Sequence, residues 1–432
     1  MASLLPLRHR ASSSRALSHL RAHLQQRWSF ATHAAAGAQR GSLLGLQGMQ
    51  QFHMEKLSGW EQATHQLAAS DCEPLSLSEL LALADDECRV KWESLSLGYP
   101  PSRGDEQLLA EIADGLYAGN DLSTENILGV VPAEGILLAM HALLSPGDHV
   151  VVVSPCYASL RSVAEAALGC TVSPWCVEWQ ADGRPTFCTD KLRQLVTQRK
   201  TTLLVVNFPH NPTGFVPTLD EWSQIVRICD ERGIWLFSDE MYRHLERHED
   251  GCVTLPSAAE NYSRGVTLSG LSKAYGLPGL RVGWLASPDV ELISRCFDLK
   301  DYTTICASWP SECLALIALR NRQILWDRCN GIISHNIGLM SNFVQGREQV
   351  IEWRPPQGGP VALPRLLSGG AIDHCAAALQ SEGVMLIPDR EFGTATERET
   401  GAYADNRLRI GLGRKGFVEM LQAWARVLDA GA

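Results

Sequence analysis

Two cations, Lys273 and Arg281, stand eight residues apart in a segment rich in small residues. The segment runs from Ser269 to Trp284 and reads SGLSKAYGLPGLRVGW. A lysine amine can form a Schiff base with a carbonyl cofactor, and the planar fork of an arginine suits a phosphate. Either residue alone is compatible with a solvated loop, so the interpretation depends on its surroundings.

Three polar residues each follow a strand-like apolar run. Lys273 comes shortly after the run 266–268, Asp239 of SDEMY follows 234–238, and Asn211 of NPTG follows 202–206. In a parallel sheet such strand ends lie side by side, and open α/β sheets bind ligands there. These side chains are therefore predicted to converge on one ligand, although Asn211 and Lys273 are more than sixty residues apart.

The elements that must position these residues alternate along the chain. Strand-like runs are expected at 149–153, 202–206, 234–238 and 282–286, and helical spacing covers 133–144, 218–232 and 289–300. Alternating strands and helices are typical of a mainly parallel sheet covered by helices. We therefore predict an α/β fold.

The length of 432 residues, with 45% hydrophobic residues, favours two domains. We expect residues 96–310 to form a large cofactor-binding domain. Residues 51–95 are predicted to supply an N-terminal arm and part of a smaller α+β domain, which residues 311–432 complete. Residues 1–50 are predicted to be a basic, disordered targeting segment.

The lysine segment, GLPGLRVGW, NPTG and SDEMY together resemble the aspartate aminotransferase superfamily, the class I/II pyridoxal-phosphate enzymes of fold type I. The resemblance extends from about Phe52 to the C-terminus, and SDCEPLSL and FPHNPTG point to an aminotransferase-like branch. It implies pyridoxal 5'-phosphate as cofactor, an amino acid and a 2-oxo acid as substrates, and a homodimer.

The same resemblance implies a role for four residues around the cofactor ring. Lys273 would form the Schiff base and then move the substrate's Cα proton. Asp239 would pair with the pyridine nitrogen, and Asn211 and Tyr242 would hydrogen-bond the phenolic oxygen. The plainer alternatives are that SDE caps a helix and that NPTG is only a turn.

Ser272, Arg281 and Ala133 are implied to hold the phosphate, Ala133 through its N–H at a helix N-terminus. The chain departs from the family pattern at two places. Residues 131–132 are Val-Pro where Gly-Ala is usual, and Gly270 stands where serine is common. Proline has no N–H to donate, so these departures put the phosphate assignment in question.

Three further residues complete the predicted site. Tyr157 matches the aromatic residue that stacks on the cofactor ring, with a core tyrosine as the alternative. Tyr99 matches a tyrosine that reaches the neighbouring subunit's phosphate, with packing on its own chain as the alternative. Arg409 in RIGLG matches the arginine that binds the substrate α-carboxylate, and Arg407 is the competing candidate.

Charge and cysteine usage restrict the class of protein. The net charge of -10 offers no electrostatic footprint for nucleic acid or an anionic membrane, and no run of 18 apolar residues predicts a membrane span. The thirteen cysteines form no CxxC pair, so we expect no metal site and a reducing compartment. Cys156 beside the predicted cofactor ring is read as a buried filler rather than a functional thiol.

The first 54 residues contain no Asp or Glu but six arginines, with Ser12–Ser14 among them. Such a composition is typical of a mitochondrial or plastid transit peptide. A disordered basic tail on an otherwise cytoplasmic protein is the alternative. A helix-turn-helix is disfavoured because the stretch lacks helical apolar periodicity.

The sequence thus predicts an aminotransferase that acts through a Lys273 Schiff base. A C–S β-lyase or a cyclase on the same fold remains open, because the lysine, aspartate and arginine roles do not distinguish these reactions. A non-catalytic regulatory protein is the third alternative, and the intact Lys273, Asp239 and Arg409 argue against it.

Overall fold

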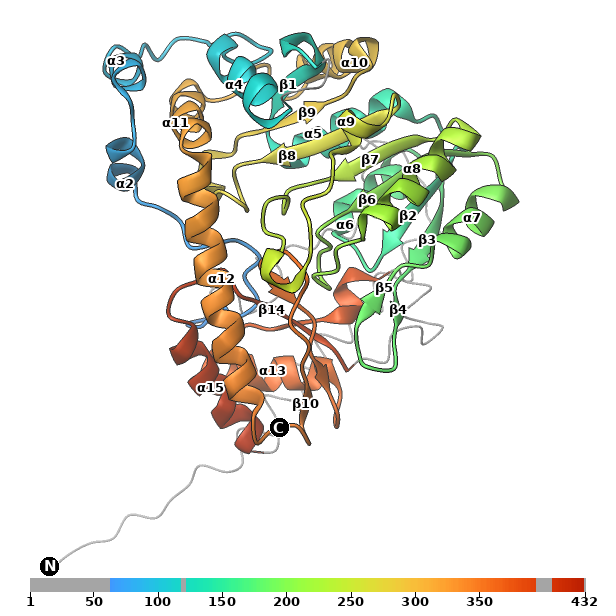
Figure 1. Cartoon of the computed structure of the whole chain (residues 1–432), viewed down its shortest axis with the longest axis vertical. Helices are drawn as coiled ribbons and strands as arrows, with labels where there is room; N and C mark the ends of the chain where they lie inside the picture. Colours follow the sequence, from blue (N-terminus) through green and yellow to red (C-terminus); the bar gives the residue numbers. More distant parts are fainter. Residues whose placement is uncertain (1–62, 118–121, 394–405, 431–432) are drawn as a thin grey trace, which may run out of the picture.

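The computed structural model describes residues 63–117, 122–393 and 406–430. Figure 1 shows a larger body built around a sheet and a smaller body below it, joined by the long helix α12 (Arg322–Val344). The predicted targeting segment 1–50 lies outside the described residues, so its role stays a prediction.

Within the described residues, the central sheet has seven strands in the order β1-β9-β8-β7-β6-β2-β3. Strands β2, β3, β6, β7 and β8 pair in parallel, whereas β9 runs antiparallel to β1 and β8. The predicted mainly parallel α/β fold is confirmed. The strand bounds are β1 Ile127–Val130, β2 His149–Ser154, β3 Thr171–Cys176, β6 Thr201–Asn207, β7 Trp235–Asp239, β8 Gly265–Gly270 and β9 Gly283–Ala286.

Helices surround this sheet and form close to the predicted bounds. The cap residues explain this accuracy for α8 (Leu219–Arg232): Thr218 accepts a hydrogen bond from the Glu221 N–H, and Gly233 ends the helix with φ 62°. The others are α5 Pro132–Leu143, α6 Ala158–Ser162, α7 Thr189–Gln198, α9 Ala258–Asn261 and α10 Val290–Lys300.

The large body's core lies between the sheet and its helices. Strand β2 reads HVVVVS and is buried at every position, as is most of β6, TTLLVVN. Continuous apolar runs of this kind suit strands covered on both faces. Each fully buried Val or Leu side chain stabilises the fold by about 1.5–3 kcal/mol relative to its exposed state. This core fixes the strand ends that carry the site.

The small body combines both ends of the described chain. Its three-stranded sheet, β11-β14-β13, receives residues 63–70 alongside: the Gly411 N–H donates to the Leu67 carbonyl at 2.6 Å. A Cβ at Gly411 would lie 1.7 Å from the Ala69 carbonyl oxygen, so this close passage requires glycine. The remaining elements are β10 Ile351–Glu352, β11 Val361–Ala362, β12 Arg365–Leu366, α13 Ala371–Glu382, β13 Ile387–Pro388, β14 Leu408–Gly411 and α15 Phe417–Asp429.

Residues 77–93 leave the small body and lie along the left side of the large one in Figure 1. They form α2 (Leu77–Ala82) and α3 (Asp86–Glu93), which contact α11 (Trp309–Arg320), as α4 (Glu106–Leu116) also does. The described part of the predicted arm 51–95 is thus divided between the two bodies. Helix α4 ends at Leu116, with Tyr117 as its C-cap residue.

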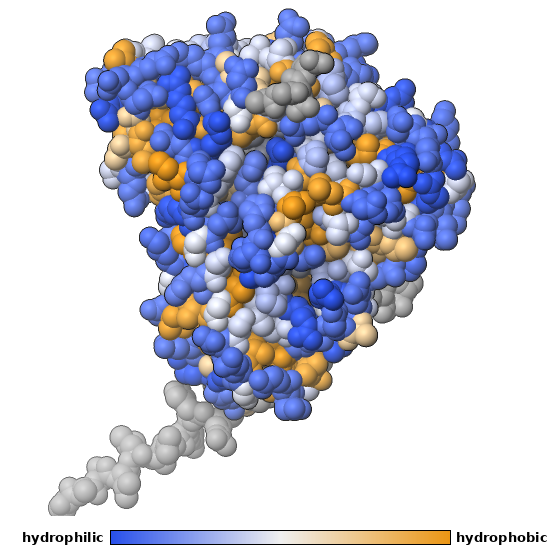
Figure 2. Space-filling view, viewed as in Figure 1, coloured by the Kyte–Doolittle hydropathy of each residue, from blue (hydrophilic) through white to orange (hydrophobic). Residues whose placement is uncertain are grey.

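Figure 2 shows that the viewed face is mostly hydrophilic with separate hydrophobic patches. None of the helices in the described ranges is long and apolar enough to cross a bilayer. The described residues also contain no group of three or more His, Cys, Asp or Glu side chains suited to hold a metal ion.

Candidate active site

Four predicted site residues lie at or just beyond the ends of neighbouring parallel strands, and all four line one cavity of about 330 Å³. Tyr157 follows β2, Asn211 follows β6, Asp239 ends β7 and Lys273 follows β8. The cavity lies at the carboxyl edge of the sheet, where ligands bind in this architecture. Its size suits a small organic ligand, since such pockets usually span roughly 300–1,000 Å³.

Nine of the ten predicted site residues line this cavity. Besides the four at the strand ends, these are Ala133, Tyr242, Ser272, Arg281 and Arg409. The exception is Tyr99, whose side chain is 90% exposed in the single chain. The cavity therefore gathers the residues that the motifs singled out, apart from the one expected to act across subunits.

The surroundings of the Lys273 amine favour its neutral form more than water does. Its Nζ donates a hydrogen bond to Ser70 Oγ at 2.9 Å. Burial lowers the pKa of Lys273 to about 8, although the Asp71 carboxylate pulls it upward. A larger fraction of this lysine is thus the neutral nucleophile near pH 7 than for a solvated lysine.

Asp239 is buried, and burial raises its pKa to about 6. The Met241 N–H donates to Asp239 Oδ1 at 3.1 Å, and this bond together with Lys273 opposes the rise. Asn207, which pairs with Asp239 in the strand register, donates from Nδ2 to the Asp239 carbonyl at 2.8 Å. A cation facing Asp239 would stabilise its ionised form further.

Arg409 reaches the cavity from β14 of the small body. Its Nη1 donates to Asn211 Oδ1 at 3.2 Å and its Nη2 to the Ala68 carbonyl at 2.9 Å. Arg409 Nε has no hydrogen-bond partner among the described residues, and only 3% of the residue is exposed. Arginine carries five N–H donors, so this guanidinium keeps donors for an anionic ligand.

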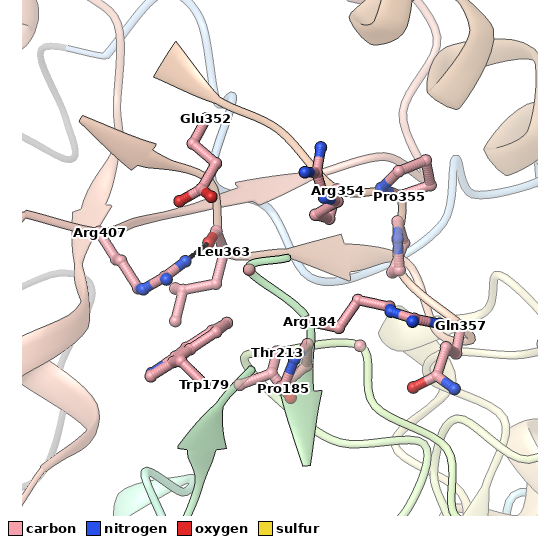
Figure 3. A pocket seen from close by; sticks show the side chains of 13 residues that line it. Trp179, Arg184, Pro185, Thr213, Glu352, Arg354, Pro355, Gln357, Leu363 and Arg407 are labelled. Atoms are coloured by element: carbon pink, nitrogen blue, oxygen red, sulfur yellow. Dashed lines mark hydrogen bonds between the residues drawn. The ribbon is translucent and has the colours of Figure 1, made fainter. Parts of the chain in front are cut away.

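Arg407, the competing arginine, belongs to a different cavity (Figure 3). Its guanidinium lies 3.4 Å from the ring centroid of Trp179, on the hairpin formed by β4 (Glu178–Trp179) and β5 (Pro185–Thr186). Arg407 Nη1 donates to the Leu363 carbonyl at 3.2 Å. Arg407 therefore links the two bodies and does not face the central cavity.

The anion-binding end of the cavity combines a helix N-terminus with two side chains. Ala133 is the second residue of α5, so its N–H lies among those that a helix leaves without internal acceptors. Arg281 Nη1 lies 3.4 Å from Ser272 Oγ and donates to the Pro278 carbonyl at 3.0 Å. These groups suit a phosphate.

Both departures from the family pattern belong to one packing arrangement. Gly270 pairs with Gly283 across β8 and β9, and a Cβ at Gly270 would lie 2.9 Å from Gly283 Cα and 2.9 Å from the Val282 carbonyl oxygen. The Pro132 ring lies over this glycine pair, with Cγ 2.9 Å from a Cβ built at Gly283. Pro132 and the glycine at 270 are therefore sterically matched.

His210 fixes the loop of Asn211 to the loop of Tyr157. Its Nε2 is 2.8 Å from the Pro155 carbonyl and its Nδ1 is 2.8 Å from Thr213 Oγ1. Burial lowers the pKa of His210 to about 3, so the ring is neutral. Nε2 then donates to the carbonyl and Nδ1 accepts from the hydroxyl.

Ser70, Asp71 and Asn207 also line the cavity, and the sequence analysis did not single them out. Ser70 and Asp71 lie in SDCEPLSL, which carried the resemblance but gave no chemical role. Asn207 ends β6 just as Asp239 ends β7, so its position at a strand end was the sequence signal that could have identified it as a site residue.

Before any comparison, the fold and the cavity suit a class of α/β enzymes in which a lysine binds a phosphorylated carbonyl compound at a sheet edge. The residues present fit pyridoxal phosphate, because the cavity offers a carboxylate, an amine and an anion-binding end in one space. Comparison with known proteins refines this class. Residues 79–421 match the family "Aminotransferase class I and II", and the chain belongs to it.

Relatives in this family carry more than one activity. The chain is 33% identical to capreomycidine synthase of Streptomyces vinaceus over 76% of its own length and 81% of that protein. It is 29% identical to the aspartate aminotransferase of Musicola paradisiaca over 48% of the chain and 52% of that enzyme.

Solved structures agree with this assignment. A PLP-dependent aminotransferase from Streptococcus suis superposes with a TM-score of 0.77 at 27% identity, covering 91% of this chain and 99% of that one. The PLP-dependent cyclase OrfR superposes with a TM-score of 0.76 at 27% identity, covering 92% and 100%. The predicted family and its cofactor, pyridoxal phosphate, are confirmed, whereas the type of reaction is not decided.

Proposed function

We propose that the chain is a pyridoxal-phosphate-dependent aminotransferase that moves an amino group between an amino acid and a 2-oxo acid. One observation carries the proposal: Lys273, Asp239 and Arg409 open on the same cavity. An amine, a buried carboxylate and a buried guanidinium are the groups that amino-group exchange on this cofactor needs.

The cofactor would be held at both ends. Arg281, Ser272 and the N-terminus of α5 would bind its phosphate, each charge-assisted hydrogen bond contributing about 1.5–3 kcal/mol. Asp239 would pair with the ring nitrogen, Tyr157 would pack on the ring, and Asn211 and Tyr242 would hydrogen-bond the phenolic oxygen. Bound pyridoxal phosphate supplies a carbonyl carbon for the amines and a ring that delocalises the charge left at the substrate's Cα.

Lys273 would move the substrate's Cα proton. Burial gives Lys273 a pKa of about 8, which makes it a competent base near neutral pH. A positioned proton-transfer group of this kind contributes about 10²- to 10⁴-fold in rate. Arg409 orients the substrate by pairing with its α-carboxylate, and this sets which Cα bond faces Lys273.

A cyclase is the second candidate, because capreomycidine synthase and the cyclase OrfR are among the similar proteins. Both reactions begin with proton removal at Cα, so Lys273, Asp239 and Arg409 serve either. The product distinguishes them: a transaminase consumes a 2-oxo acid stoichiometrically, whereas a cyclase returns a ring-closed amino acid and needs no acceptor.

The test is the absorbance spectrum of the purified holoprotein with a panel of amino acids, for wild type, Lys273→Ala and the surface control Lys191→Ala. Wild type and control are expected to be yellow and to bleach to the amino form of the cofactor with some amino acid. Lys273→Ala is expected to lack both changes. Absence of a yellow band in wild type with added pyridoxal phosphate would refute the proposal.

A further inference from the structure

One charged group in the central cavity has no part in the amino-group exchange described above. The charged residues that line the cavity are Asp71, Asp239, Lys273, Arg281 and Arg409. The last four have a partner in the cofactor or in the substrate's amino and carboxylate groups. Asp71 is left over, and it lines the same cavity.

Asp71 is held in a fixed orientation from outside the cavity. Arg414 Nε donates to Asp71 Oδ1 at 3.2 Å and Arg414 Nη2 to Oδ2 at 2.7 Å, while Arg414 is not among the lining residues. A carboxylate has about four lone-pair sites, so this bidentate pair leaves acceptor capacity. The Asp71 side chain remains 15% exposed. It can therefore accept further hydrogen bonds from a ligand.

Asp71 lies close to the amine of Lys273 and the guanidinium of Arg409 within the cavity. Burial lowers the pKa of both Lys273 and Arg409, and the charge of Asp71 opposes each of these shifts, so Asp71 lies within electrostatic reach of both. Ser70, the preceding residue, accepts the Lys273 hydrogen bond. Lys273 must be neutral when it accepts a proton. At that moment Lys273 contributes no positive charge beside Asp71 in the cavity.

We propose that Asp71 determines substrate specificity, selecting amino acids whose side chains carry an amine or a guanidinium over neutral and acidic ones. This inference rests on the proposed function and names its substrate class. A cationic side chain would give Asp71 a second partner beside Arg414, on the side that opens into the cavity, whereas an acidic side chain would meet a like charge there.

The competing role for Asp71 is electrostatic balance for Lys273 and Arg409, without contact to the side chain. The two roles predict different kinetics. Loss of a side-chain contact changes the ratio between substrates, whereas loss of charge balance changes every substrate alike. A series of substrates therefore separates them.

The experiment measures kcat/KM of the holoenzyme for the first half-reaction with ornithine, norvaline and glutamate. It uses wild type, Asp71→Asn, Asp71→Glu and the exposed control Asp86→Asn. Wild type is expected to prefer ornithine, and Asp71→Asn to lower the ornithine-to-norvaline ratio about ten- to hundredfold. Asp71→Glu should recover part of the ratio, and Asp86→Asn should leave it unchanged.

A second measurement avoids turnover. Dissociation constants of α-methylornithine and α-methylnorvaline, which have no Cα proton to lose, are read from the holoenzyme spectrum. The ornithine analogue should lose its advantage in Asp71→Asn. An equal loss for both analogues, or a wild type that prefers norvaline or glutamate, would overturn the proposal. No spectral response of wild type to any amino acid would instead refute the proposed function.

Discussion

Lys273 and Asp239 both line the cavity, and burial shifts their pKa values in opposite directions. The pKa of Lys273 falls to about 8 and that of Asp239 rises to about 6, because a low-dielectric site disfavours the charged form of each. Each group opposes the shift of the other. The cavity therefore holds a partly neutral base beside a carboxylate that any cationic ring would keep ionised.

The shift of Lys273 predicts the pH dependence of cofactor capture. Neutral amine increases through the pKa, so the rate at which apoprotein takes up pyridoxal phosphate should rise with a midpoint near pH 8, not near the ordinary 10.5. Stopped-flow absorbance measures this rate. Lys273→Arg is the control and should show no such rise. A midpoint above pH 10 would contradict the burial argument.

Asp239→Asn should separate catalysis from stability. The amide cannot keep the ring nitrogen protonated, and loss of such an electrostatic stabiliser should lower kcat about 10²- to 10³-fold. The folded-state pKa of Asp239, about 6, lies above its ordinary 3.8, so the ionised group destabilises the apoprotein as pH rises between those values. Asp239→Asn removes that cost, and apoprotein Tm at pH 7 should not fall. A Tm drop with unchanged kcat would contradict both expectations.

At the scale of elements, the sequence predicts the helices and strands whose ends are marked by residues close by in the chain. Thr218 and Gly233 mark the ends of α8, and the apolar runs mark the strands that end at Asn207 and Asp239. Because parallel strands align their ends, convergence of the site residues follows from this pattern alone.

Other parts depend on contacts between distant residues and carry no local signal. Trp179 and Arg407 are separated by more than two hundred residues, yet their stacking joins the β4–β5 hairpin to the small body. Asp71 enters the cavity only because residues 63–70 run beside β14. The match of Pro132 to Gly270 also becomes visible only when β8, β9 and α5 are assembled.

This match predicts that the serine common in the family is harmful here. In Gly270→Ser the new Cβ would lie 2.9 Å from backbone atoms of residues 282 and 283, which cannot move as a side chain can. Overpacking of this kind costs about 1–3 kcal/mol of unfolding free energy, measurable in urea. Gly279→Ser is the matched control, since nothing lies within 4 Å of a Cβ there. Tighter cofactor binding by Gly270→Ser without loss of stability would refute the steric account.

At the scale of the whole molecule, exposed apolar side chains gather beside the anion-binding end of the cavity. Leu97, Tyr99, Tyr302 and Ile305 are all exposed in the single chain. Lys300 joins their two loops by donating from Nζ to the Ser102 carbonyl at 2.5 Å, and Thr304 Oγ1 donates to Glu134 of α5 at 2.8 Å. We propose that this surface, which includes Tyr99, faces a second copy of the chain.

A dimer in which Tyr99 reaches the partner's phosphate predicts complementation between two defective chains. Lys273→Ala lacks the amine and Tyr99→Ala lacks the phosphate contact, but their heterodimer contains one site with both groups. Refolding the two together should give activity well above the sum of the separate homodimers, approaching about a quarter of wild-type sites by random pairing. Light scattering on each preparation should report dimers. A monomer, or a mixture no more active than its parts, would show that Tyr99 does not act across subunits, and the complete site would then lie within one chain.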